Sequence, residues 1–213
     1  MAETIFVINF FLLRLPALLL LLFFSRLLSA QADTSHSIKV HFWYGSKPLH
    51  STKKTESKYF GGLHGGHVTI EVDSIDYGLV PGNGLHIFAH KKNLSGIFSS
   101  KRTYGLPPYP PGHKFVTFII PVSAEQYQKI NEINSCYCKQ APYDYAFFGM
   151  RCASAAYEVL SHLDIVKERS NFSNVCKNFY PKKLRKKLLR LARKNNWIVI
   201  RKQGRVSRKW ERE

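Results

Sequence analysis

Residues 65–72, GGHVTIEV, predict a β-strand that begins directly after a glycine turn. Valine, threonine and isoleucine favour extended backbone, and glycine permits the turn before them. Further strands are predicted at 38–44 (IKVHFWY), 75–80, 85–89 and 114–121 (KFVTFIIP), with turn clusters such as PGNG at 81–84 between them. The first two thirds of the chain therefore predict a sheet.

Three helices are predicted after these strands. Ser123 and Gln126 fit a capping box, and apolar residues recur at helical spacing beyond it. Residues 152–163 (CASAAYEVLSHL) predict a second helix, and 181–195 (PKKLRKKLLRLARKN) a third with proline in its first turn. Residues 197–201 and 205–210 predict a short hairpin. Because the strands precede the helices without βαβ alternation, we predict an α+β fold with a small antiparallel sheet packed against helix 152–163.

The N-terminal segment has the pattern of an export signal. Residues 5–28 are strongly apolar, and Ala30-Gln31-Ala32 is the small-x-small pattern that a signal peptidase cleaves. Arg14 and Arg26 shorten the uninterrupted apolar run to about ten residues, which is fewer than a bilayer-spanning helix needs. We predict a signal peptide over 1–32, with an uncleaved anchor as the alternative, and one exported domain over 33–213.

The composition excludes a disordered chain, because 45% of the 213 residues are hydrophobic. The formal net charge is +18, and residues 177–213 hold 15 Lys or Arg against 2 acidic residues. One interpretation is a tail that binds anionic lipid or polymer. The other is a helix docked through an apolar stripe formed by Leu184, Leu188, Leu191 and Ala192. We expect a docked helix whose charged face also contacts an anionic membrane surface, and no nucleic-acid partner.

Cys152 is the candidate nucleophile because it opens a predicted helix. A thiol at a helix N-terminus meets unpaired N–H groups and the positive end of the helix dipole, and both favour a thiolate of lowered pKa. Arg151 adds positive charge beside it. The same N–H groups are suited to hold an oxyanion.

His67 is the candidate base because it begins a strand directly after Gly65-Gly66, where the backbone can approach a neighbour closely. His64 in the same turn is the spare candidate and a residue of the expected substrate pocket. A third polar group is needed to orient the imidazole. We assign Asp76 to that role, with Glu71 and His86 as alternatives.

The remaining cysteines and histidines carry weaker signals. In an exported chain, Cys136 or Cys138 is expected to bridge to Cys176, or these residues stay as thiols. His86 and His90 lie on one predicted strand, where four residues span about 13 Å, which is too far for one metal ion. His64 and His67 with an outside carboxylate are a weak alternative zinc set. We therefore predict neither a metal site nor a cofactor.

Two segments together resemble a known family. GGHVTIEV at 65–72 and PYDYAFFGMRCAS at 142–154 are similar to motifs of the circularly permuted papain-like group. That group includes the NlpC-like permuted amidases, the lecithin–retinol acyltransferase relatives and the lipoprotein N-acyltransferase domain of bacterial envelopes. In these proteins, too, the histidine strand precedes the cysteine helix. The resemblance covers roughly residues 60–165.

The resemblance implies a permuted papain-like fold and a thiol hydrolase or acyltransferase that cleaves an amide or ester bond. His67 is then the base and Cys152 the nucleophile, and the pocket residues are Tyr143, Asp144, Tyr145 and Arg151. It also implies a location in the periplasm or cell envelope, with a peptidoglycan peptide, a lipid or a lipoprotein as substrate. The alternative is a non-catalytic envelope protein that binds anionic polymer or lipid through its basic C-terminal region.

Overall fold

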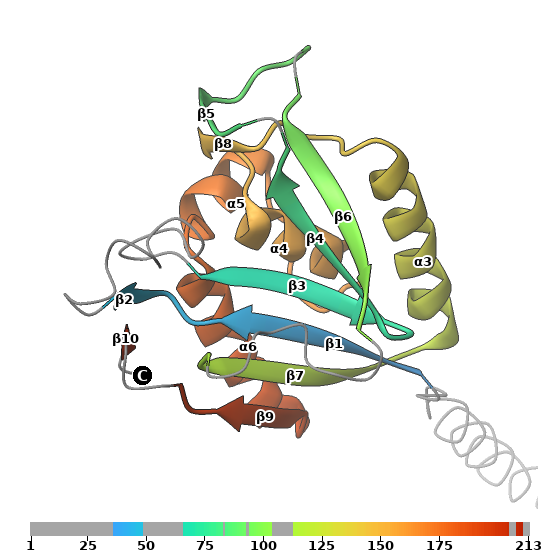
Figure 1. Ribbon diagram of the computed structural model, residues 1–213. Helices are drawn as coiled ribbons and strands as arrows, with labels where there is room; N and C mark the ends of the chain where they lie inside the picture. Colours follow the sequence, from blue (N-terminus) through green and yellow to red (C-terminus); the bar gives the residue numbers. More distant parts are fainter. Residues whose placement is uncertain are drawn as a thin grey trace, which may run out of the picture. The chain divides into compact units, whose positions relative to one another are not determined.

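The central sheet of the computed structural model contains six antiparallel strands, in the order β6-β4-β3-β1-β7-β9 (Figure 1). Their bounds are β1 His36–Trp43, β3 His67–Val72, β4 Ile75–Pro81, β6 Gly96–Arg102, β7 Phe115–Val122 and β9 Ile198–Lys202. The structure describes residues 36–48, 66–82, 84–92, 94–103, 113–204 and 208–210, with only the backbone of 46–48 and 208–210. The predicted signal peptide and His64 lie outside these residues.

Four helices lie within the described residues: α3 Ala124–Lys139, α4 Cys152–His162, α5 Asn171–Lys177 and α6 Pro181–Asn195. Helices α4, α5 and α6 lie behind the sheet in Figure 1, and α3 runs alongside β6. Two small sheets complete the fold. Strand β2 (Ser46–Pro48) pairs with β10 (Arg208–Trp210), and β5 (His86–Phe88) pairs in parallel with β8 (Ala146–Phe148). The predicted α+β class is confirmed.

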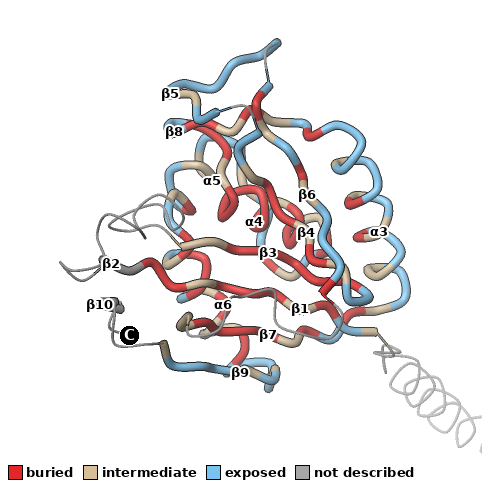
Figure 2. Tube along the Cα trace, viewed as in Figure 1, coloured by how far each residue is buried: buried red, intermediate tan, exposed pale blue. Residues whose placement is uncertain are grey.

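The hydrophobic core lies between the sheet and α4, and buried segments concentrate there (Figure 2). Val68 pairs with Phe42 and Ile70 pairs with Val40, so these four apolar side chains share the sheet face that packs on the helices. Ala153 and the other small residues of α4 are fully or almost fully buried. They let the helix backbone approach the sheet closely, and this contact places the first residue of α4 against β3.

The opposite face of the sheet carries a network of polar side chains. His41 lies between two partners, with Nδ1 2.8 Å from Thr117 Oγ1 and Nε2 3.1 Å from Glu71 Oε2. Lys39 Nζ donates to Glu71 Oε1 at 2.6 Å. His41, Glu71 and Thr117 are all buried, so these mutual hydrogen bonds offset the cost of removing their polar groups from water.

The C-terminal region differs from prediction in its strand pairing. Helix α6 is docked, since Leu184 and Leu188 have no exposed surface. The following segments do not form a hairpin. Instead, β9 extends the main sheet along β7, and β10 pairs with β2. The edge of β7 offers unpaired backbone groups and lets Val199 pack on the core, so it is the better partner for β9.

Strand β6 was not predicted from sequence, because GIFSSKR lacks a sustained apolar alternation. It pairs with β4 along seven residues, and Phe98 opposite Leu79 supplies its buried contact. Among the described residues, no helix is long and apolar enough to cross a membrane.

Candidate active site around Cys152

Cys152 is the first residue of α4, and local hydrogen bonds fix its position. Arg151 has an extended backbone with φ −140° and ψ 175°, which ends the preceding loop. Its backbone N–H donates to Ser154 Oγ at 2.8 Å, and its carbonyl accepts from Ala155 N at 2.9 Å. The sequence thus starts the helix at Cys152, as predicted, and holds the thiol at the helix N-terminus.

The Cys152 sulfur is surrounded by hydrogen-bond donors but is removed from solvent. Burial raises the pKa of the thiol, whereas the Val68 and Ala153 N–H groups, the Arg151 charge and the Tyr145 hydroxyl act to lower it. Burial outweighs the others, so the pKa lies above its ordinary value and the resting group is a thiol. The expected lowering of the pKa by the helix N-terminus is therefore wrong, because the side chain is buried.

His67 begins β3, and the next residue along the strand contacts the Cys152 sulfur through its N–H group. The His67 ring packs on Trp43 with centroids 5.4 Å apart. Burial lowers the pKa of His67 to about 4, so the imidazole is neutral at pH 7 and has a lone pair to accept a proton. The structure thus brings the two candidate catalytic residues to the same end of β3.

The two side chains approach this place from different faces of the sheet. Alternation along β3 puts His67 with Thr69 on the polar face and Val68 on the face toward α4. The ladder between β3 and β4 covers residues 70–72 and 75–77, and beyond it the strands diverge (Figure 1). Gly78 lies at this divergence, and a Cβ added there would lie 3.5 Å from His67 Nε2. Sulfur and imidazole therefore reach this end of β3 from opposite faces of the sheet.

The three candidates for the orienting group serve other networks. Glu71 is bound by Lys39 and His41, as described above. His86 Nδ1 lies 2.7 Å from an Asp144 oxygen. Asp76 is buried on the polar face, and the groups that act on its carboxyl besides burial are Thr69, His41, Glu71 and Lys101. In the described part of the chain, none of the three candidates hydrogen-bonds to His67.

The three consecutive residues predicted in the pocket diverge. The Tyr143 hydroxyl donates to Glu158 Oε1 at 2.9 Å, on α4 and away from the thiol. Asp144 points into the loop after β5, where it accepts hydrogen bonds from Ser95. Tyr145 contacts the Cys152 sulfur. Of these three, only Tyr145 is adjacent to the thiol, because an irregular segment turns each side chain in a new direction.

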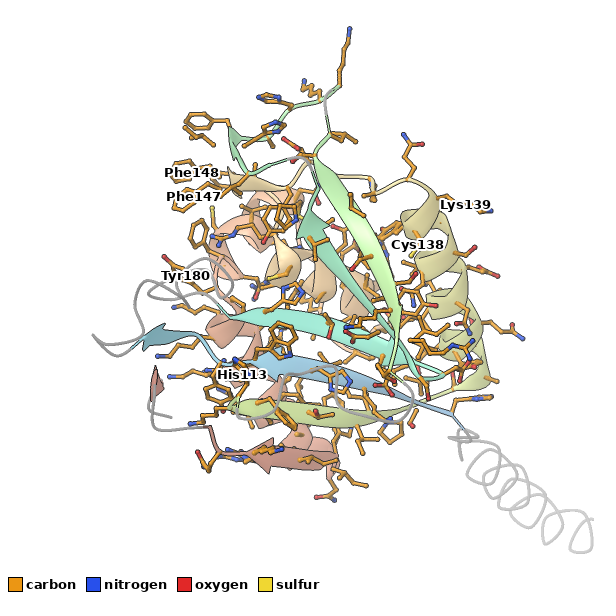
Figure 3. The ribbon with its side chains drawn as sticks, in the orientation of Figure 1. His113, Cys138, Lys139, Phe147, Phe148 and Tyr180 are labelled. Atoms are coloured by element: carbon orange, nitrogen blue, oxygen red, sulfur yellow. The ribbon has the colours of Figure 1, made fainter. Side chains whose placement is uncertain are left out.

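An exposed aromatic surface lies beside the thiol, and sequence reasoning did not identify it. The Arg151 guanidinium stacks on the rings of Phe147 and Phe179, at 5.5 and 4.5 Å from their centroids. Phe147 and Phe148 project outward from β8 (Figure 3). Phe148 stacks on Phe88 of the neighbouring β5 at 5.5 Å. The apolar members with more than a third of their surface exposed are Leu85, Ile87, Phe88, Phe147 and Phe148.

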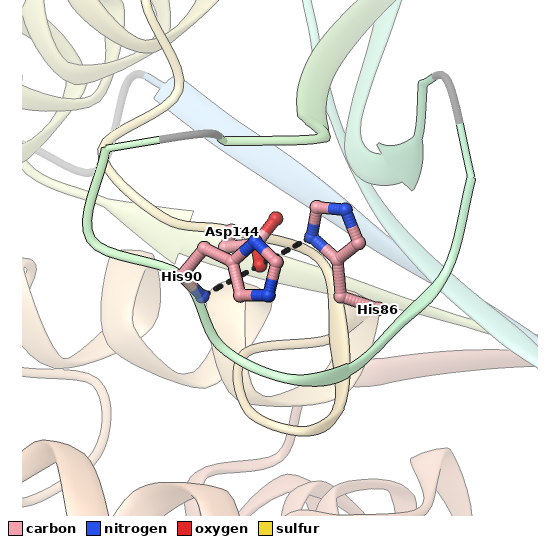
Figure 4. Close-up of side chains that lie close together, drawn as sticks. All are labelled: His86, His90 and Asp144. Atoms are coloured by element: carbon pink, nitrogen blue, oxygen red, sulfur yellow. Dashed lines mark hydrogen bonds and ion pairs between the residues drawn. The ribbon is translucent and has the colours of Figure 1, made fainter.

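The separation predicted for His86 and His90 is wrong. Strand β5 ends at Phe88, and the chain then turns, so the two imidazoles stack with centroids 4.1 Å apart and planes at 21°. Asp144, which is distant in sequence, contacts both residues: its carboxylate lies against His86 Nδ1 and accepts a hydrogen bond from the His90 backbone N–H (Figure 4). The spacing of about 13 Å requires extended backbone from residue 86 to residue 90, and the sequence does not show that β5 ends after three residues.

The cysteines are free thiols in this structure. Cys136, Cys138 and Cys176 are exposed, and Cys152 is buried. The bridge expected from Cys136 or Cys138 to Cys176 is absent among these described residues. The two segments sit on different helices: α3 packs on β1 and β6, whereas α5 packs on α4.

Compared with known proteins, the chain matches no family model, and no curated protein resembles it at a significant level.

Proposed function

We propose that this protein is a cysteine-dependent hydrolase or acyltransferase that acts on an amide or ester bond, with a permuted papain-like arrangement of its site. One observation carries the proposal. The first residue of α4 is a cysteine whose sulfur meets the backbone N–H of Val68, directly after His67. A thiol at a helix N-terminus and a neutral histidine at the start of the adjoining strand are the two groups that nucleophilic catalysis requires.

In the proposed reaction, the resting pair is a neutral thiol and a neutral imidazole. The Cys152 sulfur attacks the substrate carbonyl carbon while His67 accepts the thiol proton. N–H groups at the start of α4 hold the negative oxygen of the tetrahedral intermediate. The intermediate collapses to a thioester at Cys152, and the protonated His67 gives its proton to the leaving amine or alcohol. Water, an amine or an alcohol then releases the acyl group.

We propose an acyl-lipid or lipoprotein of the cell envelope as substrate, in preference to a peptidoglycan peptide. The aromatic surface beside Arg151 supports this choice, because exposed Phe88 and Phe148 suit an acyl chain better than a polar peptide. Lys91 and Lys92 follow this surface on the same loop, and their charge suits anionic headgroups. The envelope location is carried over from the expected export signal.

The test is turnover of matched ester, thioester and amide substrates with acyl chains of two to twelve carbons. Wild type should release product, and Cys152→Ala and His67→Gln should lose activity by at least 100-fold. His36→Gln is the matched control, since His36 stacks on Tyr127 at the other end of β1 and should leave turnover unchanged. Turnover that survives Cys152→Ala would overturn the proposal.

A second candidate function is binding of an anionic surface by α6. Its exposed cations are Lys183, Lys186, Arg190, Arg193 and Lys194. Arg193 also lines a cavity of about 370 Å³ between α6 and β9, with Arg201 and Trp197. Sedimentation with phosphatidylglycerol vesicles tests this function. Lys183→Ala combined with Lys186→Ala should weaken binding, and both substitutions should leave turnover unchanged.

A further inference from the structure

Three side chains that bind metals in other proteins meet at the loop after β5. His86, His90 and Asp144 each offer a nitrogen or oxygen atom, and these atoms lie within 4.8 Å of one another. In a tetrahedral zinc site, ligand atoms are separated by about 3.3 Å, given metal–ligand distances of about 2.0 Å. The His86–Asp144 contact of 2.7 Å must therefore open slightly and the longest separation must close by about 1.5 Å. Side-chain rotation alone supplies movements of this size.

The hydrogen bonds of Asp144 leave a place for a cation. One carboxylate oxygen, Oδ1, accepts from the backbone N and the hydroxyl of Ser95 at 2.7 and 2.9 Å. The other, Oδ2, accepts from the His90 backbone N at 2.8 Å and from His86 Nδ1. If a metal ion replaces the His86 proton, Oδ2 still has two partners, and the proton moves to Nε2 of the same ring. The exchange therefore leaves no lone pair of Asp144 unsatisfied.

The carboxylate is held ready for this exchange. Its side chain has no exposed surface, and the backbone N–H groups of His90 and Ser95 fix its orientation. One imidazole is in contact with this carboxylate, and the second imidazole is stacked on the first (Figure 4).

The donor set selects the kind of ion. Two imidazoles and one carboxylate suit zinc and related divalent transition metals, whereas magnesium and calcium prefer oxygen ligands throughout. His86 is partly exposed and His90 is exposed, so solvent reaches the ligand atoms. A fourth position is therefore open to water or to another ligand.

We propose that His86, His90 and Asp144 form a zinc-binding site at the end of β5, with Ser95 as the group that orients the carboxylate. This site is independent of the thiol chemistry proposed above, and it lies on the loop that carries the exposed aromatic surface. Zinc bound there ties β5 to the segment before β8 and so holds that surface in one arrangement.

The test is zinc titration of the full-length protein after removal of metal with EDTA. Exposed thiols also bind zinc, so the measurement uses protein carrying Cys136→Ser, Cys138→Ser and Cys176→Ser. Calorimetry should give one zinc ion per chain. His86→Gln and His90→Gln should each weaken binding at least tenfold. Cobalt(II) in place of zinc should give the intense visible absorption of a four- or five-coordinate complex, which His90→Gln should abolish.

His162→Gln is the matched control, because this partly exposed histidine also lies near a carboxylate, with Nε2 3.8 Å from Glu158 Oε1. It should leave zinc affinity within twofold of the parent. His90 is exposed, so His90→Gln keeps the fold even if His86→Gln does not, and circular dichroism checks both. Equal zinc affinity in the parent, His90→Gln and His162→Gln proteins would overturn the proposal.

Discussion

Glu71 on β3 and Asp76 on β4 lie directly opposite each other, and the pKa values of their carboxyl groups are displaced in opposite directions. Burial acts to raise both. For Glu71, hydrogen bonds from His41 and Lys39 overcome burial and lower the pKa to about 2. For Asp76, burial prevails and raises the pKa to about 6. Of these two adjacent buried carboxyl groups, Glu71 is therefore an anion throughout the neutral range, whereas Asp76 ionises near pH 6.

Replacing Asp76 with asparagine should stabilise the protein at neutral pH. Because the folded pKa is raised above the unfolded value of 3.8, stability falls as pH rises from about 4 to 6 and stays reduced above. Asp76→Asn removes this dependence, so between pH 4 and pH 7 the free energy of unfolding of the variant should gain about 2–3 kcal/mol on that of wild type. Urea unfolding at pH 4, 5, 6 and 7 measures it.

Asp164→Asn is the control for this series, since Asp164 is exposed. Its pH profile should parallel that of wild type. A parallel profile for Asp76→Asn as well would show that Asp76 titrates normally in the folded state.

His67→Gln should flatten the acid side of the stability profile. The folded pKa of His67 is lowered from 6.5 to about 4 by burial, so below pH 6.5 the unfolded chain binds a proton that the folded chain resists. The stabilisation is present above pH 6.5 and is lost as pH falls toward 4. The variant should gain about 2 kcal/mol on wild type between pH 7 and 4. This is less than the full displacement of the pKa implies, because His67 keeps some exposed surface. Equal slopes in both proteins would place His67 in solvent.

Helix α6 should contribute to stability through its buried stripe. Leu188 has no exposed surface, and Leu188→Ala should lower the free energy of unfolding by about 2–5 kcal/mol through lost burial and a new cavity. Lys186 is exposed on the same helix, and Lys186→Ala should change the free energy of unfolding by less than about 0.5 kcal/mol. Thermal unfolding distinguishes the two. A small effect of Leu188→Ala would mean that α6 is an undocked tail.

Gly96 on β6 should not tolerate a side chain. A Cβ there would lie 2.5 Å from the Tyr143 carbonyl oxygen and 3.3 Å from the Tyr145 backbone nitrogen. Backbone atoms cannot rotate away, so Gly96→Ala should shift this segment and cost about 1–3 kcal/mol. Ile97→Val at the next, exposed position should have little effect. Because Tyr145 contacts Cys152, the glycine variant should also slow turnover, and unchanged turnover would contradict that link.

The sequence was sufficient for the elements with a strong local pattern. Strand β7 (KFVTFIIP in the sequence), the capping box at Ser123 and the start of α4 at Cys152 are confirmed, because alternation and end signals are properties of a few adjacent residues. Strand β6 and the separate pairing of β9 and β10 could not be predicted. Both depend on which sheet edge is available in the folded chain.

The candidate site was predictable in its positions and less so in its energetics. A pattern can place Cys152 at a helix N-terminus, but the pKa of the thiol depends on burial by distant segments. The directions of Tyr143, Asp144 and Tyr145 depend on irregular backbone, for which residue spacing gives no rule. The contact of His86 with His90 required knowing that β5 ends after three residues.

The most direct test of the proposed function is to trap the acyl group on the enzyme. Protein carrying Cys136→Ser, Cys138→Ser and Cys176→Ser keeps Cys152 as its one thiol among the four cysteines of the chain. It would be treated with a nitrophenyl ester of a medium-chain fatty acid, quenched in acid and examined by intact-mass and peptide mass spectrometry. We predict one acyl group on Cys152, strongly reduced by His67→Gln and unaffected by His36→Gln. Absence of acyl-Cys152, or equal acylation with His67→Gln, would contradict the account.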